Sequence, residues 1–491
     1  MEATAGGFLL VLLVVVPVTG LLLGFALGGR APERIALWLM PVGLAMALVL
    51  LAGVLHAKAP VVAFVGGWAP PLGLALRADG LAAAMLLTTA LIIGAIAYFA
   101  RADYRTPLHA PEARASLAFW CFLLALWAAL NAAFLGGDLF NLFVALEMLT
   151  FGALALACLD GKATQFKAEL RYLLFALIGS VLYLLGTALL YGAYGTLDIL
   201  LLARAARADA ATIVAASLMT VGLLGKMALF PLHLWLPAAH AGAPPAASAL
   251  LSGLVVKASY VLLLRLWFWV MPAALLLAVA PILALLGAAA ILFGSLVALR
   301  QARLKLLVAY STVAQIGYLF LMFPLVAGSA GEIAERAWTG GALQAISHAF
   351  AKAAMFLAAG VIARAMGHDR IAELQGAARI APLSVLAFGL AGLSLMGIPP
   401  SGGFTAKWLL LQAALDSGQW WWALVIVAGG LLTGGYVFRV LSAAMRARAA
   451  PIFPMVPVDL AQERVALGLA VISVLLGLLP LGAFGLVLIG R

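Results

Sequence analysis

Long apolar runs separated by short polar connections dominate this chain. A hydrocarbon core of about 30 Å requires roughly 20 apolar residues in helical form. Of the 491 residues, 66% are hydrophobic and 10% are charged, whereas soluble domains carry about 25% charged residues. A soluble fold is therefore excluded, and an all-α integral membrane protein is expected. The fourteen predicted transmembrane helices cover approximately residues 7–28, 35–55, 80–100, 115–135, 138–158, 170–194, 211–236, 244–268, 272–298, 304–326, 338–364, 381–415, 419–444 and 464–488.

Basic residues are distributed unevenly between the two sets of connections. Connections after odd-numbered predicted helices carry 18 Lys or Arg residues, and those on the other side carry 7. Because basic loops are retained in the cytoplasm, both termini are expected on the outer face of a cell inner (plasma) membrane. The net charge of +11 then reflects orientation, so no nucleic-acid partner is expected.

A single membrane domain, residues 1–491, is expected, because no connection is long enough for a soluble domain. The longest runs from His56 to Gly80 and contains Gly and Pro pairs typical of an extended or hairpin loop. Neither a phosphate loop nor zinc-type Cys/His spacing is present. His233 and His240 lie on either side of a proline, a poor arrangement for haem ligands. We expect no cofactor and no metal.

Glu147 is the carboxylate predicted to lie deepest in the membrane. It is nine residues beyond Asp138, or roughly 13 Å along a helix, near the bilayer midplane. An ionisable side chain at that depth costs at least about 2.5 to 3.5 kcal/mol, so it indicates a function by default. The alternative is a structural ion pair that joins two helices.

The seventh predicted helix should be interrupted just after Lys226. Pro231 has no N–H, so the carbonyl of Met227 loses its helical partner, and Gly222 and Gly225 loosen the same stretch. Free carbonyls at the end of a half-helix favour a cation and water there. A proline kink that serves packing alone is the alternative.

The twelfth predicted helix contains a second interruption. Pro399, Pro400, Gly402 and Gly403 precede Lys407, and unwound backbone inside a bilayer is tolerated only where it lines protein or a wet cavity. Paired interrupted helices are typical of inverted-repeat transporters. We therefore predict two inverted five-helix repeats, at approximately residues 115–270 and 272–444.

Three further ionisable residues fall inside predicted helices. Lys257 lies deep in the eighth, and His348 and Lys352 share one face of the eleventh at a spacing of four. Burial disfavours the charged form of a lysine and a nearby carboxylate favours it. Together with Glu147, Lys226 and Lys407, these side chains predict a proton relay rather than a catalytic site.

The motifs around these residues resemble one family. The segments 138–147, 225–237, 249–257, 309–318, 348–352 and 397–407 closely resemble, in the same order, the antiporter-like subunits of respiratory complex I and of Mrp-type cation/proton antiporters. The likeness extends over essentially the whole chain. The segment Asp138-Leu-Phe-Asn-Leu-Phe-Val is most similar to the D-type Mrp subunit.

This resemblance implies a fourteen-helix fold with inverted repeats and a central hydrophilic axis. It implies that Glu147 and Lys226 form the ion pair that gates proton movement, that Lys257 and His348 form the central relay with Lys352 beside it, and that Lys407 is the terminal lysine. Gln315 stands where other members have a histidine. A neutral amide holds water but carries no charge, so transfer there should be water-mediated.

The expected function is that of a proton-translocating subunit in a multisubunit Na⁺/H⁺ antiporter, a transporter rather than an enzyme. Its expected partners are protons, Na⁺, other membrane subunits and the lipid bilayer. No acidic cluster suited to Na⁺ is evident in the sequence. The alternatives are a proton-pumping subunit of a complex I-like quinone oxidoreductase or membrane-bound hydrogenase, and a scaffold whose charges only join helices.

Overall fold

The computed structural model describes residues 3–106, 113–161, 163–447 and 454–491. In this part of the chain, twelve helical segments are long and apolar enough to cross a membrane. They are α1 (Phe8–Leu27), α2 (Ala31–Ala57), α3 (Gly80–Ala100), α4 (Arg114–Leu135), α5 (Leu139–Ala157), α6 (Ala163–Tyr194), the continuous segment Pro245–Val270, α12 (Ala273–Arg300), the segment Leu304–Ala327, α15 (Gly331–Met366), α19 (Trp420–Met445) and the segment Leu460–Leu478.

Two more apolar helices are shorter because the chain unwinds after them. The first is α8 (Ala210–Lys226), which is followed by turns and then by α9 (Leu236–Gly242). The second is α17 (Pro382–Met396), which is followed by a break and then by α18 (Gly402–Asp416). The remaining short helices of the described residues are α7 (Ile199–Ala205), α14 (Met322–Ala327) and α16 (Ala377–Ile380).

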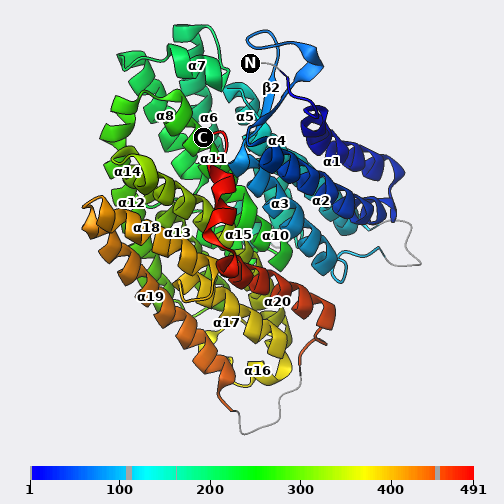
Figure 1. Cartoon of the computed structure of the whole chain (residues 1–491). Helices are drawn as coiled ribbons and strands as arrows, with labels where there is room; N and C mark the ends of the chain where they lie inside the picture. The colour runs from blue at the N-terminus through cyan, green and yellow to red at the C-terminus, as the bar shows by residue number, and fades with distance from the viewer. Residues whose placement is uncertain (1–2, 107–112, 162, 448–453) are drawn as a thin grey trace.

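A small hairpin ties both ends of the chain to the same side of the bundle (Figure 1). Strands β1 (Val61–Phe64) and β2 (Ala75–Ala78) pair antiparallel, in the connection expected to be extended. Thr4 exchanges hydrogen bonds with Val62 near the N-terminus. Near the C-terminus, Arg77 donates to the carbonyl of Gly490 at 2.5 Å.

The helix predicted over 464–488 differs from the observed structure. The α-helix α20 spans Leu460–Leu475 and continues as a 3₁₀ turn to Leu478. After Pro480, the chain forms a separate 3₁₀ segment over Leu481–Leu488. Proline cannot donate the backbone hydrogen bond that would continue the helix, and hydropathy alone does not detect this change of direction.

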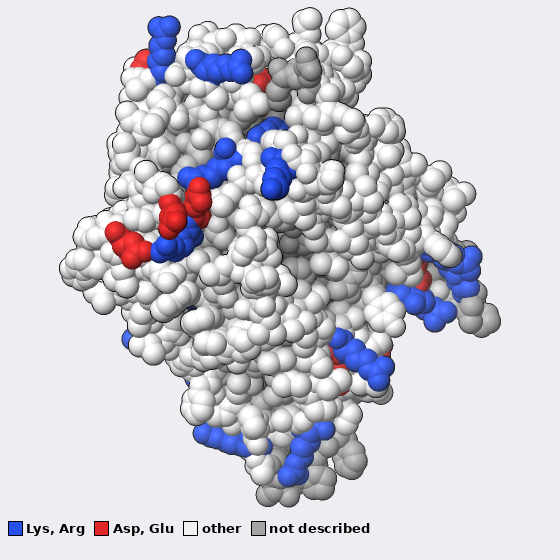
Figure 2. Space-filling model, in the orientation of Figure 1, with Lys and Arg blue, Asp and Glu red and all other residues white. Residues whose placement is uncertain are grey.

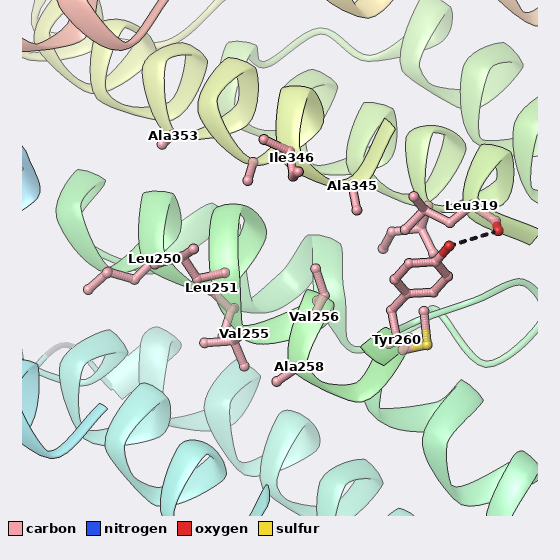
Figure 3. Packing of buried hydrophobic residues seen from close by; sticks show 14 of the residues in the cluster. Leu250, Leu251, Val255, Val256, Ala258, Tyr260, Leu319, Ala345, Ile346 and Ala353 are labelled. Carbon is pink, nitrogen blue, oxygen red and sulfur yellow. Dashed lines mark hydrogen bonds between the residues drawn. The ribbon is translucent and has the colours of Figure 1, made fainter. Parts of the chain in front are cut away.

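The centre of the molecule is formed by α15 and by the segment that packs along it. That segment comprises α10 (Pro245–Leu250), a π-helical stretch over Leu251–Val255, α11 (Val256–Arg265) and a second π-helical stretch over Leu266–Val270. Figure 3 shows apolar side chains of the two elements facing each other, with Tyr260 donating to the carbonyl of Leu319 at 3.4 Å. Helices α1–α4 lie on one side of this centre and α16–α20 on another (Figure 1).

Most of the visible surface is uncharged, as expected of a chain surrounded by lipid. Figure 2 shows the charged side chains in separate groups, with broad uncharged areas between them. Large exposed apolar side chains follow one face of α19 and include Leu424, Leu431 and Phe438. The polar side chains that remain inside the bundle are therefore costly, and each one requires a partner or a function.

Arg265 is a buried arginine whose hydrogen-bond partners are backbone carbonyls. Its guanidinium donates to the carbonyls of Ala133, Phe134 and Gly136 at the end of α4, with Nη1 2.6 Å from the Gly136 oxygen. These carbonyls have no helical donor of their own. The arginine thus caps α4 and joins it to α11.

We expect Arg265→Met to destabilise the fold by about 3 kcal/mol or more, because several buried carbonyls lose charge-assisted hydrogen bonds. The apparent melting temperature of the detergent-purified protein should fall by several degrees. Arg204→Met, at an exposed position of α7, is the control and should leave it unchanged. Equal melting temperatures for the two variants would contradict the capping role.

Candidate functional site

Glu147 and Lys226 form an ion pair inside the bundle. Glu147 lies on α5, and its Oε1 is 3.1 Å from Nζ of Lys226 at the end of α8. The lysine side chain is 5% exposed and the glutamate side chain 20% exposed. Lys226 also donates to Thr150 at 2.9 Å, and the hydroxyl of Ser180 on α6 donates to the same glutamate oxygen. The carboxylate is thus held by two donors from different helices.

The end of α8 determines where the ammonium of Lys226 lies. The helix stops at this residue, Pro231 lies in the turns that follow, and the indole N–H of Trp235 donates to the carbonyl of Gly225 at 2.8 Å. A Cβ added at Gly222 would lie 2.3 Å from the carbonyl oxygen of Gly179, so glycine is required where α8 crosses α6. The cation therefore sits at the negative end of a half-helix dipole.

Lys257 lies directly after the first π-helical stretch of the central segment. Its Nζ donates to the carbonyl of Ser252 within that stretch. The hydroxyl of Ser252 is 2.9 Å from that of Thr312 on α13 (Leu304–Phe320). Lys257 is fully buried and makes no ion pair with a described carboxylate. π-Helical turns are frequent at functional sites.

Three polar side chains follow one stripe of α15 at a spacing of four residues: Gln344, His348 and Lys352. Lys352 donates to the carbonyl of Val308 at 3.1 Å and to the hydroxyl of Ser311, both on α13. Neither ring nitrogen of His348 has a hydrogen-bond partner among the described residues.

Lys257, His348 and Lys352 form a central cluster, a term used below for these three residues. Lys257 interacts electrostatically with Lys352, and His348 interacts with Lys257, Lys352 and Lys407. No carboxylate is among these interactions. Like charges repel strongly in a low-dielectric interior, so such a cluster suits the transient passage of a charge better than its permanent storage.

Lys407 lies on the second half of the interrupted helix but uses the first half as its partner. Its Nζ is 2.5 Å from the carbonyl oxygen of Leu395 and 3.5 Å from that of Met396, at the end of α17. The ammonium also lies 4.0 Å from the ring centroid of Tyr318. Like Lys226, it thus occupies the negative end of a half-helix.

The break before Lys407 depends on residues that the sequence singled out. Pro399 and Pro400 lie between the two half-helices, and Gly402 and Gly403 begin α18. A Cβ at Gly403 would lie 1.9 Å from the carbonyl oxygen of Ser394, so only glycine allows α18 to approach α17 this closely.

Gln315 connects the surroundings of Lys407 to α15. Its amide nitrogen is 3.0 Å from the same Leu395 carbonyl oxygen that Lys407 contacts. Its amide oxygen accepts a hydrogen bond from Gln344 at 3.1 Å, one turn before His348. Gln344 was not singled out from the sequence, although its spacing of four from His348 was a detectable signal.

Two other buried ionisable residues were not assigned to the relay from the sequence, where His240 was considered only as a haem ligand. His240 is fully buried on α9, stacks on Phe356 at 4.4 Å between ring centroids, and interacts electrostatically with Lys257 and Lys352. Glu169 is buried on α6. The sixth helix was predicted over 170–194, but α6 begins at Ala163, so this glutamate lies within the helix and not in the loop before it.

Two cavities lie near the ionisable residues. A polar cavity of about 440 Å³ is lined by the α5–α6 connection, α9, the α12–α13 connection and the end of α15. Its walls include Gln165, Gly242, Lys305 and His368. A second cavity, about 330 Å³ and mainly apolar, reaches Lys407 between α18 and α19. Among the described residues, no group of three or more His, Cys, Asp or Glu side chains could hold a metal ion.

The structure therefore arranges the six predicted residues in groups. Glu147 and Lys226 are in direct contact, the central cluster lies beside α13 and α15, and Lys407 lies at the second interruption. No hydrogen bond between described side chains joins Lys226 directly to Lys257.

Comparison with known proteins gives relatives of two kinds. The chain is 36% identical over 410 residues to the N-type subunit of NADH-quinone oxidoreductase from Desulforudis audaxviator, covering 82% of this chain and 78% of that one. It is 30% identical over 405 residues to the D-type subunit of the Na(+)/H(+) antiporter from Alkalihalophilus pseudofirmus, covering 82% of this chain and 79% of that one.

The fold is similar to a solved chain in the Mrp complex from Dietzia sp. The two superpose with a TM-score of 0.89 at 28% identity, over 99% of this chain and 96% of the other. The family model described as NADH:quinone oxidoreductase/Mrp antiporter, TM, matches residues 136–433, a range that contains all six predicted residues and both interruptions. This multi-pass membrane protein therefore belongs to the NADH:quinone oxidoreductase/Mrp antiporter transmembrane family.

Proposed function

We propose that this chain is the proton-translocating subunit of a multisubunit Na⁺/H⁺ antiporter. Protons cross it along Glu147, Lys226, the central cluster and Lys407. The observation that carries the proposal is this series of buried ionisable side chains, which begins and ends at interrupted helices. A scaffold would not need uncompensated lysines in its interior, because apolar side chains pack there at lower cost.

The proposed topology has fourteen passes. It adds the two interrupted helices, α8 with α9 and α17 with α18, to the twelve long apolar segments. The proposed inverted repeats are residues 115–270 and 272–444, each with one interruption. The face with the basic connections is placed in the cytoplasm and both termini outside, in the cell inner membrane.

The ion pair is the proposed gate. While Glu147 lies 3.1 Å from Lys226, its carboxylate stabilises the ammonium form. Separation of the two side chains removes that stabilisation in a low-dielectric site, so the lysine passes its proton toward the central cluster. Return of the carboxylate reloads it. Thr150 and Ser180 offer alternative partners while the pair is open.

Onward transfer runs through the central cluster to Lys407. His348 has no competing hydrogen bond among the described residues and interacts electrostatically with three lysines, so it can accept a proton from one side and release it to the other. Gln315 and Gln344 provide uncharged acceptors and donors on the side of Lys407. Transfer there is proposed to be water-mediated.

The proposed partners are other membrane subunits, and Na⁺ is proposed to cross outside this chain. The similarity to a D-type antiporter subunit and to a chain of the Mrp complex supports a multisubunit assembly. The exposed apolar face of α19 offers contact area for lipid or for such a subunit.

A redox-linked role is the second candidate. The 36% identity to an N-type quinone oxidoreductase subunit favours it, and the same axis would then be driven by an attached oxidoreductase. In both cases the chain itself moves protons and catalyses no chemical conversion.

The test is to isolate the native complex through a tag on this chain and reconstitute it into vesicles that contain a pH-sensitive dye. We expect an imposed Na⁺ gradient to change the internal pH, without quinone or hydrogen oxidation by the preparation. Copurifying redox subunits with redox-driven acidification would establish the second candidate instead. A complex that moves protons under neither condition would contradict both.

A further inference from the structure

Glu169 on α6 is a buried carboxylate to which the proposed relay assigns no role. The residue is 1% exposed, and neither carboxylate oxygen has a hydrogen-bond partner among the described residues. Other buried acids in the described structure have partners: Glu463, for example, accepts from the backbone N–H of Ser384 at 2.8 Å. Burying a carboxyl group without a hydrogen-bond partner costs free energy, so its presence indicates a function.

One of the residues that interact with Glu169, Tyr172, also interacts with Glu147 of the Glu147–Lys226 ion pair. Cys158, just after α5, and Tyr172, one turn further along α6, both interact with it electrostatically. Tyr172 also interacts with Glu147 and with the side chain of Thr150, and Thr150 accepts the hydrogen bond from Lys226. Tyr172 and Thr150 thus link Glu169 to the gate through electrostatic and hydrogen-bond interactions.

Tyr172 is fixed in this intermediate position. Its ring stacks on that of Trp235 with centroids 4.4 Å apart, and the indole N–H of Trp235 is bonded to the carbonyl of Gly225 next to Lys226. The same tryptophan therefore anchors both Tyr172 and the end of α8. Tyr172 is therefore coupled to the interrupted helix through this tryptophan.

The neighbours of Glu169 on α6 line the polar cavity. Ala168 and Gln165, the preceding residue and the residue one turn earlier on α6, line this space of about 440 Å³. Its charged or titratable lining residues are Arg303, Lys305, His368, Asp160 and Asp369. The cavity lies among connections of the basic face, where protons would be taken up under the proposed function.

We propose that Glu169 is the proton-loading residue of this chain, which takes protons from the polar cavity and delivers them to the Glu147–Lys226 pair. A proton from the cavity binds the carboxylate. It then passes to the Tyr172 hydroxyl, which releases its own proton to Thr150. The Thr150 hydroxyl, which donates to the Leu146 carbonyl at 2.9 Å in this structure, turns to release its proton to the Glu147 carboxylate. Glu169 is then ionised again, Glu147 is protonated, and the hydroxyls of Tyr172 and Thr150 are neutral. This inference rests on the proposed function and specifies where the protons of that function originate.

The test uses Glu169→Gln in the reconstituted complex, because glutamine keeps the shape and cannot carry a proton. Na⁺-driven proton movement per assembled complex should fall by at least about tenfold. Lowering the pH on the side of the basic face should restore part of the rate, since more frequent direct protonation of the gate replaces the lost loading step. Glu169→Asp should retain most of the activity.

Two further variants keep the test decisive. Tyr172→Phe leaves Glu169 in place, removes the intermediate hydroxyl and should lower the rate similarly. Glu463→Gln replaces a buried carboxylate on α20 that only caps α17, and it should transport at the normal rate.

The outcomes separate this inference from the function on which it rests. Normal transport with an unchanged pH profile in both Glu169→Gln and Tyr172→Phe, together with inactive Glu147→Gln, would overturn the loading role alone. A lower yield of Glu169→Gln with normal transport per complex would show that Glu169 serves packing, and would also overturn it. Normal transport in Glu147→Gln would overturn the proposed function itself.

Discussion

Glu147→Gln is expected to reduce Na⁺-driven proton movement by about a hundredfold or more. The substitution preserves shape and leaves Ser180 with a possible acceptor, but it removes the charge 3.1 Å from Nζ of Lys226. Two unit charges at about 4 Å interact by roughly 4 kcal/mol at an effective dielectric constant of about 20. Without an attraction of that size, Lys226 takes up protons much less often.

The measurement is the initial rate of dye response per reconstituted complex, with assembly checked by size-exclusion chromatography. Glu332→Gln is the matched control, because the Glu332 side chain is 91% exposed at the start of α15. Glu147→Asp should show intermediate activity, since it keeps the charge but shortens its reach. An assembled Glu147→Gln complex that transports normally would refute gating by this pair.

Lys257→Met is expected to abolish transport while leaving the protein as stable as before or more stable. The ammonium of Lys257 is fully buried and is held by one described hydrogen bond, to the Ser252 carbonyl. Replacing a buried charge with an apolar side chain of similar volume is often neutral or stabilising. Function and stability should therefore change independently, which a purely structural lysine would not allow.

This prediction requires two measurements on the same preparation: transport by the dye assay and the apparent melting temperature. Lys167→Met, at an exposed position of α6, is the control and should alter neither. The contrary outcome is a melting temperature of Lys257→Met that is lower by many degrees, with a transport rate that falls only in proportion to the loss of folded complex. Lys257 would then be a structural residue, and the relay would need another route.

The sequence was sufficient for features that depend on local chemistry. Apolar runs of membrane length identify helices, because a bilayer leaves the backbone no other way to satisfy its hydrogen bonds. The position of Pro231 predicted an end near Lys226, and α8 ends there. Likewise, the spacing of His348 and Lys352 placed both on one face of α15.

Features that depend on partners distant in sequence could not be predicted. The sequence places Lys407 after the second interruption, but it does not identify a partner for the ammonium. In the structure its ammonium reaches back to carbonyls at the end of α17. The charges around Glu169 resemble a membrane boundary and so predict a loop there, whereas packing of α6 against α8 and α9 buries this residue.

By itself, the sequence determined that this chain crosses a membrane many times, where two of its helices are interrupted, and which six ionisable side chains fall inside predicted helices. Tertiary structure alone decided which ionisable groups touch or interact: Glu147 with Lys226, His348 with three lysines, and Glu169 with Tyr172. The physical reason is that burial and interruption follow from the local cost of exposing or breaking a helix in lipid. Electrostatic partnership, in contrast, depends on distances of a few ångströms between helices, which only their packing sets.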